Sequence, residues 1–151
     1  MHTYHLTFVL PLLASMFLLS CLLIGSELTT IIDRAVNNQK IGELGTLDLA
    51  EKTTFSWDTL YVFSSGSFED EMNEAMNIQY FTHDFMVPDR HSWVIFKKDD
   101  KVVRRFELSW EYYFSDLRFH NGELTVPRDS AIFRVKKPQA DSPIRLSLEH
   151  K

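Results

Sequence analysis

The segment THDFMVPDRH, residues 82–91, concentrates the side chains of this chain that could do chemistry. A histidine oriented by a carboxylate is the usual general base of hydrolytic enzymes. Two histidines with a carboxylate can also form a metal-ligand set. One hypothesis is therefore a small hydrolase or metal-assisted enzyme that uses His83, Asp84, Asp89 and His91.

A solvated loop is the competing interpretation of the same segment. Pro88 interrupts any regular element there, and the histidine spacing fits no helical zinc motif such as H-E-x-x-H. Three metal ligands from a single loop would also need support from elsewhere in the fold. We therefore expect exposed side chains, no metal and no cofactor, and we treat catalysis as the alternative.

A second polar feature is the segment KKDDKVVRR, residues 97–105. A positive patch on one hairpin could contact lipid headgroups or an acidic protein partner, although charge on an edge strand also prevents aggregation. The formal net charge of −5 argues against nucleic-acid binding, which needs a basic face. The candidate binding residues are Lys97, Lys98, Lys101, Arg104 and Arg105.

Other common catalytic signatures are absent from the sequence. The chain has no P-loop and no G-x-G-x-x-G motif, and SSGSF at 64–68 lacks the G-x-S-x-G nucleophile elbow. With a single cysteine, the chain can form neither an intrachain disulfide nor a multi-cysteine metal site.

The elements that would position these residues follow a long apolar segment. Leu6 to Gly25 contains no Asp, Glu, Lys or Arg, and at about 1.5 Å per residue it matches the hydrocarbon core of a bilayer. We predict that residues 1–26 form a signal or anchor segment. The chain would then cross the membrane once, with the following domain outside the cytoplasm.

Cys21 allows three fates for this segment. LLSC at 18–21 is similar to a lipoprotein signal, in which the cysteine carries lipid, and a cleaved secretory signal is a further alternative. The amino end MHTYH lacks the basic residues of such signals, and LLIG continues the apolar run after the cysteine. These departures favour an uncleaved anchor, with lipid attachment at Cys21 as the alternative.

We expect four parts in the chain. The anchor is followed by a juxtamembrane helix and linker at 27–42, which either extends the anchor or packs on the domain. An α+β domain occupies 43–137, and a loose tail occupies 138–151 because it holds two prolines and little aromatic content.

Within the domain, the pattern predicts a small antiparallel or mixed sheet with one packed helix. That helix runs from Ser67, as the cap, to Asn77, and it buries Phe68, Met72, Ala75 and Met76. Strands are expected in TLDLA and TLYVFS, and in SAIFRVKK near the end. One hairpin turns at Asp99-Asp100, and a second joins YYFSDLRF to ELTV at Asn121-Gly122, with His120 at its tip.

The stretch FSWDTLYVF, residues 55–63, carries a resemblance to a group of other proteins. It resembles uncharacterised small bacterial proteins, exported or membrane-anchored and lipoprotein-like, in which a Trp-Asp pair opens a strand. The likeness spans Leu44 to Lys136; it implies an exported α+β domain and no activity. On the residues themselves, Trp57 would anchor the edge of the core, and Asp58 would bond backbone amides or the indole N–H.

These observations favour a membrane-tethered, extracytoplasmic module that binds a protein partner, as inhibitors and immunity proteins do. The membrane is contacted through Leu6 to Gly25, and no nucleic acid is expected. The alternative remains a small enzyme that uses the His83–His91 loop.

Overall fold

The computed structural model describes residues 27–117, 122–139 and 142–149. The predicted anchor Leu6–Gly25, with Cys21, and the expected hairpin tip at His120 lie outside these ranges. None of the helices within them is long and apolar enough to cross a membrane. The elements are α2 (Glu27–Asn37), β1 (Leu44–Asp48), α3 (Leu49–Lys52), β2 (Thr59–Ser64), α4 (Glu69–Met76), β3 (His91–Lys98), β4 (Lys101–Ser109), β5 (Tyr112–Phe114), β6 (Glu123–Pro127), η2 (Arg128–Ser130), β7 (Ile132–Lys136) and β8 (Ile144–Leu148).

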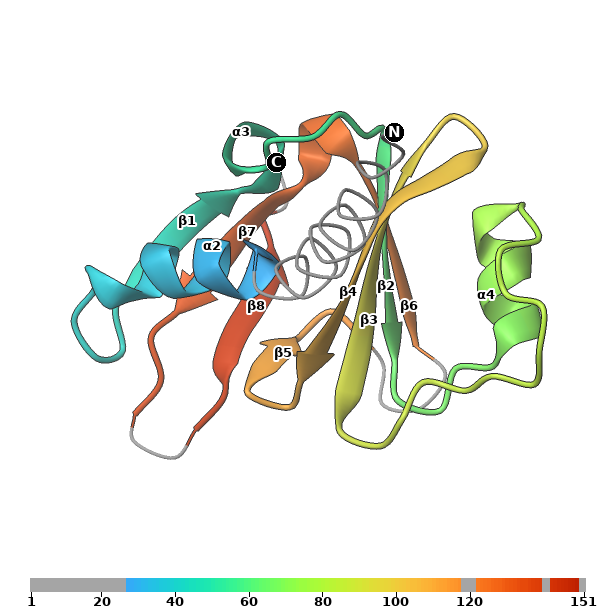
Figure 1. Ribbon diagram of the computed structural model, residues 1–151. Helices are drawn as coiled ribbons and strands as arrows, with labels where there is room; N and C mark the ends of the chain where they lie inside the picture. The colour runs from blue at the N-terminus through green and yellow to red at the C-terminus, as the bar shows by residue number, and fades with distance from the viewer. Residues whose placement is uncertain (1–26, 118–121, 140–141, 150–151) are drawn as a thin grey trace, which may run out of the picture.

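The strands form two four-stranded sheets (Figure 1). Sheet A has the order β1-β7-β8-β5, and sheet B has the order β4-β3-β2-β6. Every pair is antiparallel except β5–β8, which is parallel. The α+β class is therefore confirmed, whereas the expectation of a single sheet is wrong.

The main core lies between the two sheets and is rich in aromatic side chains. Both sheets and α2 contribute to it, and its largest fully buried members include Trp57, Phe96, Phe106, Phe114 and Phe133. A second apolar cluster covers the other face of sheet B, where Met72 and Met76 of α4 pack against Phe63, Trp93 and Ile95. Figure 1 shows α4 beyond sheet B, on the side away from α2.

Helix α2 packs on the domain, which was one of the two expected arrangements for residues 27–42. Its apolar residues Leu28, Ile32 and Val36 recur every four positions, so they share one face of the helix. All three are buried in the main core, and α2 contacts β1 and β7. The helix is therefore part of the folded unit.

Helix α4 confirms the predicted helix, with a later start. Its N-cap is Phe68, whose N–H donates to the Glu71 carboxylate at 2.9 Å. Ser67 lies one residue before the cap, and its carbonyl accepts from the N–H of Val87, which ties it to the following loop. Phe68 is half exposed and not part of the buried stripe, whereas Met72 and Met76 are fully buried as expected.

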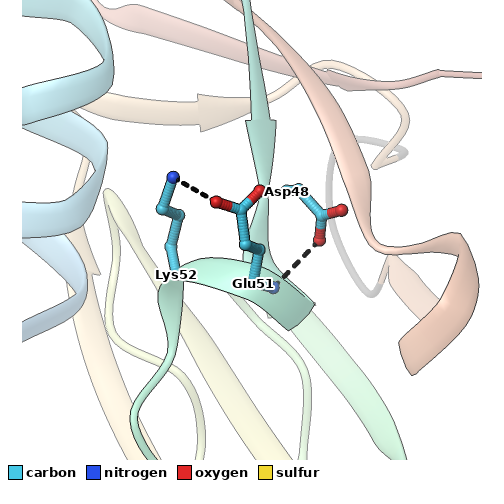
Figure 2. A network of polar contacts seen from close by, with 3 residues as sticks. All are labelled: Asp48, Glu51 and Lys52. Carbon is cyan, nitrogen blue, oxygen red and sulfur yellow. Dashed lines mark hydrogen bonds and ion pairs between the residues drawn. The ribbon is translucent and has the colours of Figure 1, made fainter.

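A short helix, α3, turns the chain from sheet A toward sheet B (Figure 2). Asp48 caps it by accepting the N–H of Glu51 at 3.2 Å, and Lys52 Nζ lies 2.7 Å from Glu51 Oε1. The Lys52–Glu51 pair is exposed, so it adds little stability. The cap fixes where the helix begins.

Strand pairing confirms one predicted hairpin and contradicts the other. Strands β3 and β4 pair from His91↔Ser109 to Lys98↔Lys101, around the turn at Asp99-Asp100. Strand β5, at the start of YYFSDLRF, and strand β6, which contains ELTV, do not pair with each other, because β5 joins β8 in sheet A and β6 joins β2 in sheet B. Phe114 of β5 lies in the core against Phe133, and the centroids of the two rings are 5.7 Å apart.

The predicted loose tail at 138–151 contains a strand. Residues 144–148 form β8, an inner strand of sheet A between β7 and β5. Leu146 is fully buried, and the Leu148 N–H donates to Asp116 Oδ2 at 2.7 Å. The alternation of Ile144, Leu146 and Leu148 supplies the apolar face that a strand needs, and the flanking prolines lie outside it.

Trp57 and Asp58 hold the start of β2. Trp57 is fully buried in the core and not at its edge, and its Nε1–H donates to Thr53 Oγ1 at 2.8 Å. Asp58 Oδ2 accepts the N–H of Asp99 at 2.8 Å, so it bonds a backbone amide, the first of its two expected partners.

Candidate functional site

The structure does not gather the four candidate catalytic residues. His83 and Asp84 are exposed on the loop between α4 and β3, and neither is bonded to Asp89 or His91. Asp89 and His91 do lie together, with His91 Nδ1 2.9 Å from the Asp89 carbonyl oxygen. Within the described ranges, no group of His, Cys, Asp or Glu is arranged to hold a metal ion.

The predicted basic patch is divided between the two faces of sheet B. Successive side chains of a strand point to opposite faces, so Arg104 stacks over Phe55 at 5.2 Å and Arg105 over Trp93 at 4.4 Å. The two neighbouring lysines are also separated: Lys97 Nζ donates to the carbonyl of Met76, whereas Lys98 Nζ donates to the hydroxyl of Ser56. Lys101 is exposed at the end of the hairpin. The five cations therefore do not form one binding surface.

A pocket of about 380 Å³ opens where the two sheets meet. The end of β2 and the start of β3 form one side of it, and the segment from Trp110 through β5 forms the other. Its volume lies in the range typical of ligand sites. The lining residues are Ser64, Ser65, Asp89, Arg90, His91, Ser92, Trp110, Tyr112, Tyr113 and Leu117.

The aromatic wall of this pocket consists of Trp110, Tyr112 and Tyr113, with Leu117 beside them. Trp110 follows β4 directly, where the chain passes from sheet B to sheet A, and it is 51% exposed. The other two tryptophans, Trp57 and Trp93, are 0% and 5% exposed. An exposed tryptophan on a concave surface is typical of a binding site.

Tyr112 is fixed within this wall. Its hydroxyl donates to Asp33 Oδ1 of α2 at 3.0 Å. Burial, this hydrogen bond, and the negative charges of Asp33 and Glu111 raise the pKa of Tyr112 to about 12. The side chain therefore stays neutral and oriented at physiological pH.

The polar end of the pocket is a tight turn from Pro88 to His91. The His91 N–H donates to the Pro88 carbonyl at 3.2 Å, and Arg90 has a φ of 63°. The Ser65 hydroxyl donates to Asp89 Oδ1 at 3.2 Å, which ties the turn to the end of β2. His91 Nε2 lies 3.7 Å from Glu107 Oε1.

This arrangement suits binding better than catalysis. An activated serine needs a hydrogen bond from its hydroxyl to a general base that a third group orients. The Ser65 hydroxyl donates to the exposed Asp89 carboxylate, and His91 takes no part in that hydrogen bond. Aromatic walls with a few fixed polar groups are typical of recognition sites. Two of the predicted residues, Asp89 and His91, thus belong to the pocket, whereas His83 and Asp84 do not line it.

Sequence reasoning missed the aromatic side of the pocket. Only YYF of the run SWEYYF at 109–114 falls in a predicted strand, as the start of YYFSDLRF, and Trp110 has no predicted role. The sequence signal for this side of the pocket is the density of aromatic residues around Glu111. Adjacent side chains of a strand point to opposite faces, so these aromatics cannot all pack in one core. No known protein family, curated protein or solved structure gives a significant match to this chain.

Proposed function

We propose that this protein is a binding module that holds a segment of a partner protein in the pocket between its two sheets. The observation that carries the proposal is Trp110, a half-exposed indole on the wall of a concave site. Tryptophan and tyrosine supply large contact areas with few side-chain rotamers to immobilise, so they dominate binding energy at protein interfaces. An apolar side chain of the partner would lie between Trp110 and Tyr112.

The module is tethered to a membrane through Leu6–Gly25, with its domain outside the cytoplasm. The length and apolar character of that segment support this part of the proposal. Lipid attachment at Cys21 is the alternative tether. An inhibitor- or immunity-like role is consistent with a small domain that binds a protein. The resemblance of residues 55–63 to exported bacterial proteins agrees with this location.

Photocrosslinking tests the proposed function in the full-length chain. A benzophenone amino acid replaces Trp110, and the protein is irradiated in native membranes. Phe68 provides a matched control site because it is 50% exposed, against 51% for Trp110, and does not line the pocket. We expect one discrete protein adduct from position 110 and none of the same mass from position 68.

Two results would contradict the proposal. The first is an absence of protein adducts from position 110. The second is an identical set of adducts from both positions, which would indicate contact by collision only. An alanine at Trp110 should also prevent co-purification of the crosslinked protein from detergent, since truncating a central aromatic anchor costs about 2 kcal/mol or more.

A further inference from the structure

The turn at the polar end of the pocket holds an arginine in an unfavourable backbone conformation. Arg90 has a φ of 63°, in the left-handed region that favours glycine and asparagine. The other non-glycine residues with positive φ in the described ranges are Asn77 and Asp99, both types that tolerate this region better. Residues held in such conformations cluster at ligand sites.

The Arg90 guanidinium is also free to bind. No hydrogen bond, ion pair or ring contact engages the side chain within the described ranges, whereas Arg104 and Arg105 stack on aromatic rings. Among the lining residues described, Arg90 is the only arginine or lysine. Guanidinium groups bind carboxylates through two parallel hydrogen bonds.

Asp89 supplies the complementary group beside it. Its Oδ1 accepts from the Ser65 hydroxyl, which fixes the carboxylate at the rim. A carboxylate has lone pairs for further donors, so it can also accept a peptide N–H from a ligand. The pocket thus offers three neighbouring features: a cation, an acceptor for an N–H, and an aromatic wall.

We propose that Arg90 makes this pocket a receptor for the carboxyl terminus of a partner protein that ends in an aromatic or large apolar residue. The terminal carboxylate pairs with Arg90, the last peptide N–H donates to Asp89, and the terminal side chain packs against Trp110 and Tyr112. This inference rests on the proposed function and adds the class of ligand.

Calorimetric titration of the full-length protein in detergent tests it. The probes are acetyl-Ala-Ala-Ala-Phe as the free acid, the same peptide as its carboxyl-terminal amide, and free phenylalanine. We expect the acid to bind about tenfold more tightly than the amide, because the amide loses a charge-assisted pair. The acid should also bind more tightly than free phenylalanine. Free phenylalanine has an ammonium group in place of the last peptide N–H, and it lacks the residues that precede the terminal one.

Arg90→Gly isolates the guanidinium without straining the turn, because glycine readily adopts positive φ. This variant should bind acid and amide with the affinity that the wild type has for the amide. Arg134→Gln loses the same charge on the outer face of sheet A, where Arg134 pairs with Glu149, and should keep the acid preference.

Equal affinity of the wild type for acid and amide would overturn the carboxyl-terminal assignment. An unchanged acid preference in Arg90→Gly, or tighter binding of free phenylalanine than of the acid, would do the same. Failure to bind either peptide would also refute the assignment. In each case the proposed function is judged separately, by crosslinking at position 110.

Discussion

At the residue scale, a chain of two hydrogen bonds holds Trp57 in the core. The indole N–H donates to Thr53 Oγ1 at 2.8 Å, and the Thr53 hydroxyl donates to the Leu49 carbonyl at 2.7 Å. The threonine hydroxyl is thus both donor and acceptor at a buried position. It lets a fully buried tryptophan satisfy its polar atom.

Removing this hydroxyl should destabilise the fold. We expect Thr53→Ala to lower the free energy of unfolding by about 1–3 kcal/mol, because the indole N–H of Trp57 loses its partner in a dry environment. Thr53→Ser keeps the hydroxyl, so its free energy of unfolding should fall clearly less than that of Thr53→Ala. Urea unfolding followed by circular dichroism measures both values, and equal losses in the two variants would contradict the role of the hydroxyl.

Tyr112 gives the fold a pH dependence in the alkaline range. Its pKa rises from 10.0 to about 12 in the folded protein, so the folded state holds the phenolic proton more tightly than the unfolded chain does. The stabilising contribution is complete below pH 10 and is lost as the pH rises through about 12. Tyr112→Phe removes this titration, so the free energy of unfolding should fall less between pH 10 and 12.

Urea titrations of the wild type and of Tyr112→Phe at several pH values measure the difference. Tyr61, whose pKa is also raised, by burial and by Glu123, is present in both proteins and contributes equally. The same decline in both proteins would show that the hydroxyl of Tyr112 is not linked to stability through Asp33.

At the element scale, helices α2 and α4 and the β3–β4 hairpin were accessible from the sequence. Helix α3, whose first residues fall in the predicted strand TLDLA, and the strand partners were not. The acidic first turn and the methionines of α4 gave its position, because both signals are local. The β3–β4 hairpin was found because its strands adjoin one charged turn. Strand β8 was missed, since its only signal is the short alternation of Ile144, Leu146 and Leu148 between prolines and charges.

The central position of β8 can be tested with one core substitution. Leu146 is fully buried between β7 and β5, so Leu146→Ala should lower the free energy of unfolding by about 2–5 kcal/mol. Arg145→Ala is the control, because Arg145 is exposed on the same strand, opposite Lys136. The control should change stability by about 0.5 kcal/mol or less. Small effects in both variants would mean that residues 144–148 are loose in solution.

At the scale of the whole molecule, the division into two sheets creates the pocket. The chain leaves sheet B after Ser109, turns at Trp110 and enters sheet A as β5, so the pocket lies at the crossing point. A sequence pattern shows which residues alternate but not which sheet a strand joins. For this reason the loop at 82–91 was identified as a candidate site, while its aromatic counterpart, far along the chain, was not.

The packing of α2 also limits where the domain can sit if Leu6–Gly25 spans a membrane. Helix α2 begins at Glu27, and Leu28 is already buried in the core, so almost no linker separates the predicted span from the folded unit. Thr54 donates to the Glu27 carboxylate at 3.0 Å, which places the loop after α3 beside that end of α2. Thr54 should therefore lie close to the lipid headgroups.

Energy transfer to labelled lipids tests this placement. In a Cys21→Ser background, single cysteines at Thr54 and at Glu74 each carry a fluorophore, and the liposomes contain an acceptor on the lipid headgroup. Glu74 is the control because it is exposed on α4, beyond sheet B from α2 (Figure 1). We expect transfer to be clearly greater from position 54. Equal transfer from both positions would contradict a short tether, and loss of the protein from the liposomes in the Cys21→Ser background would favour lipid attachment over a spanning helix.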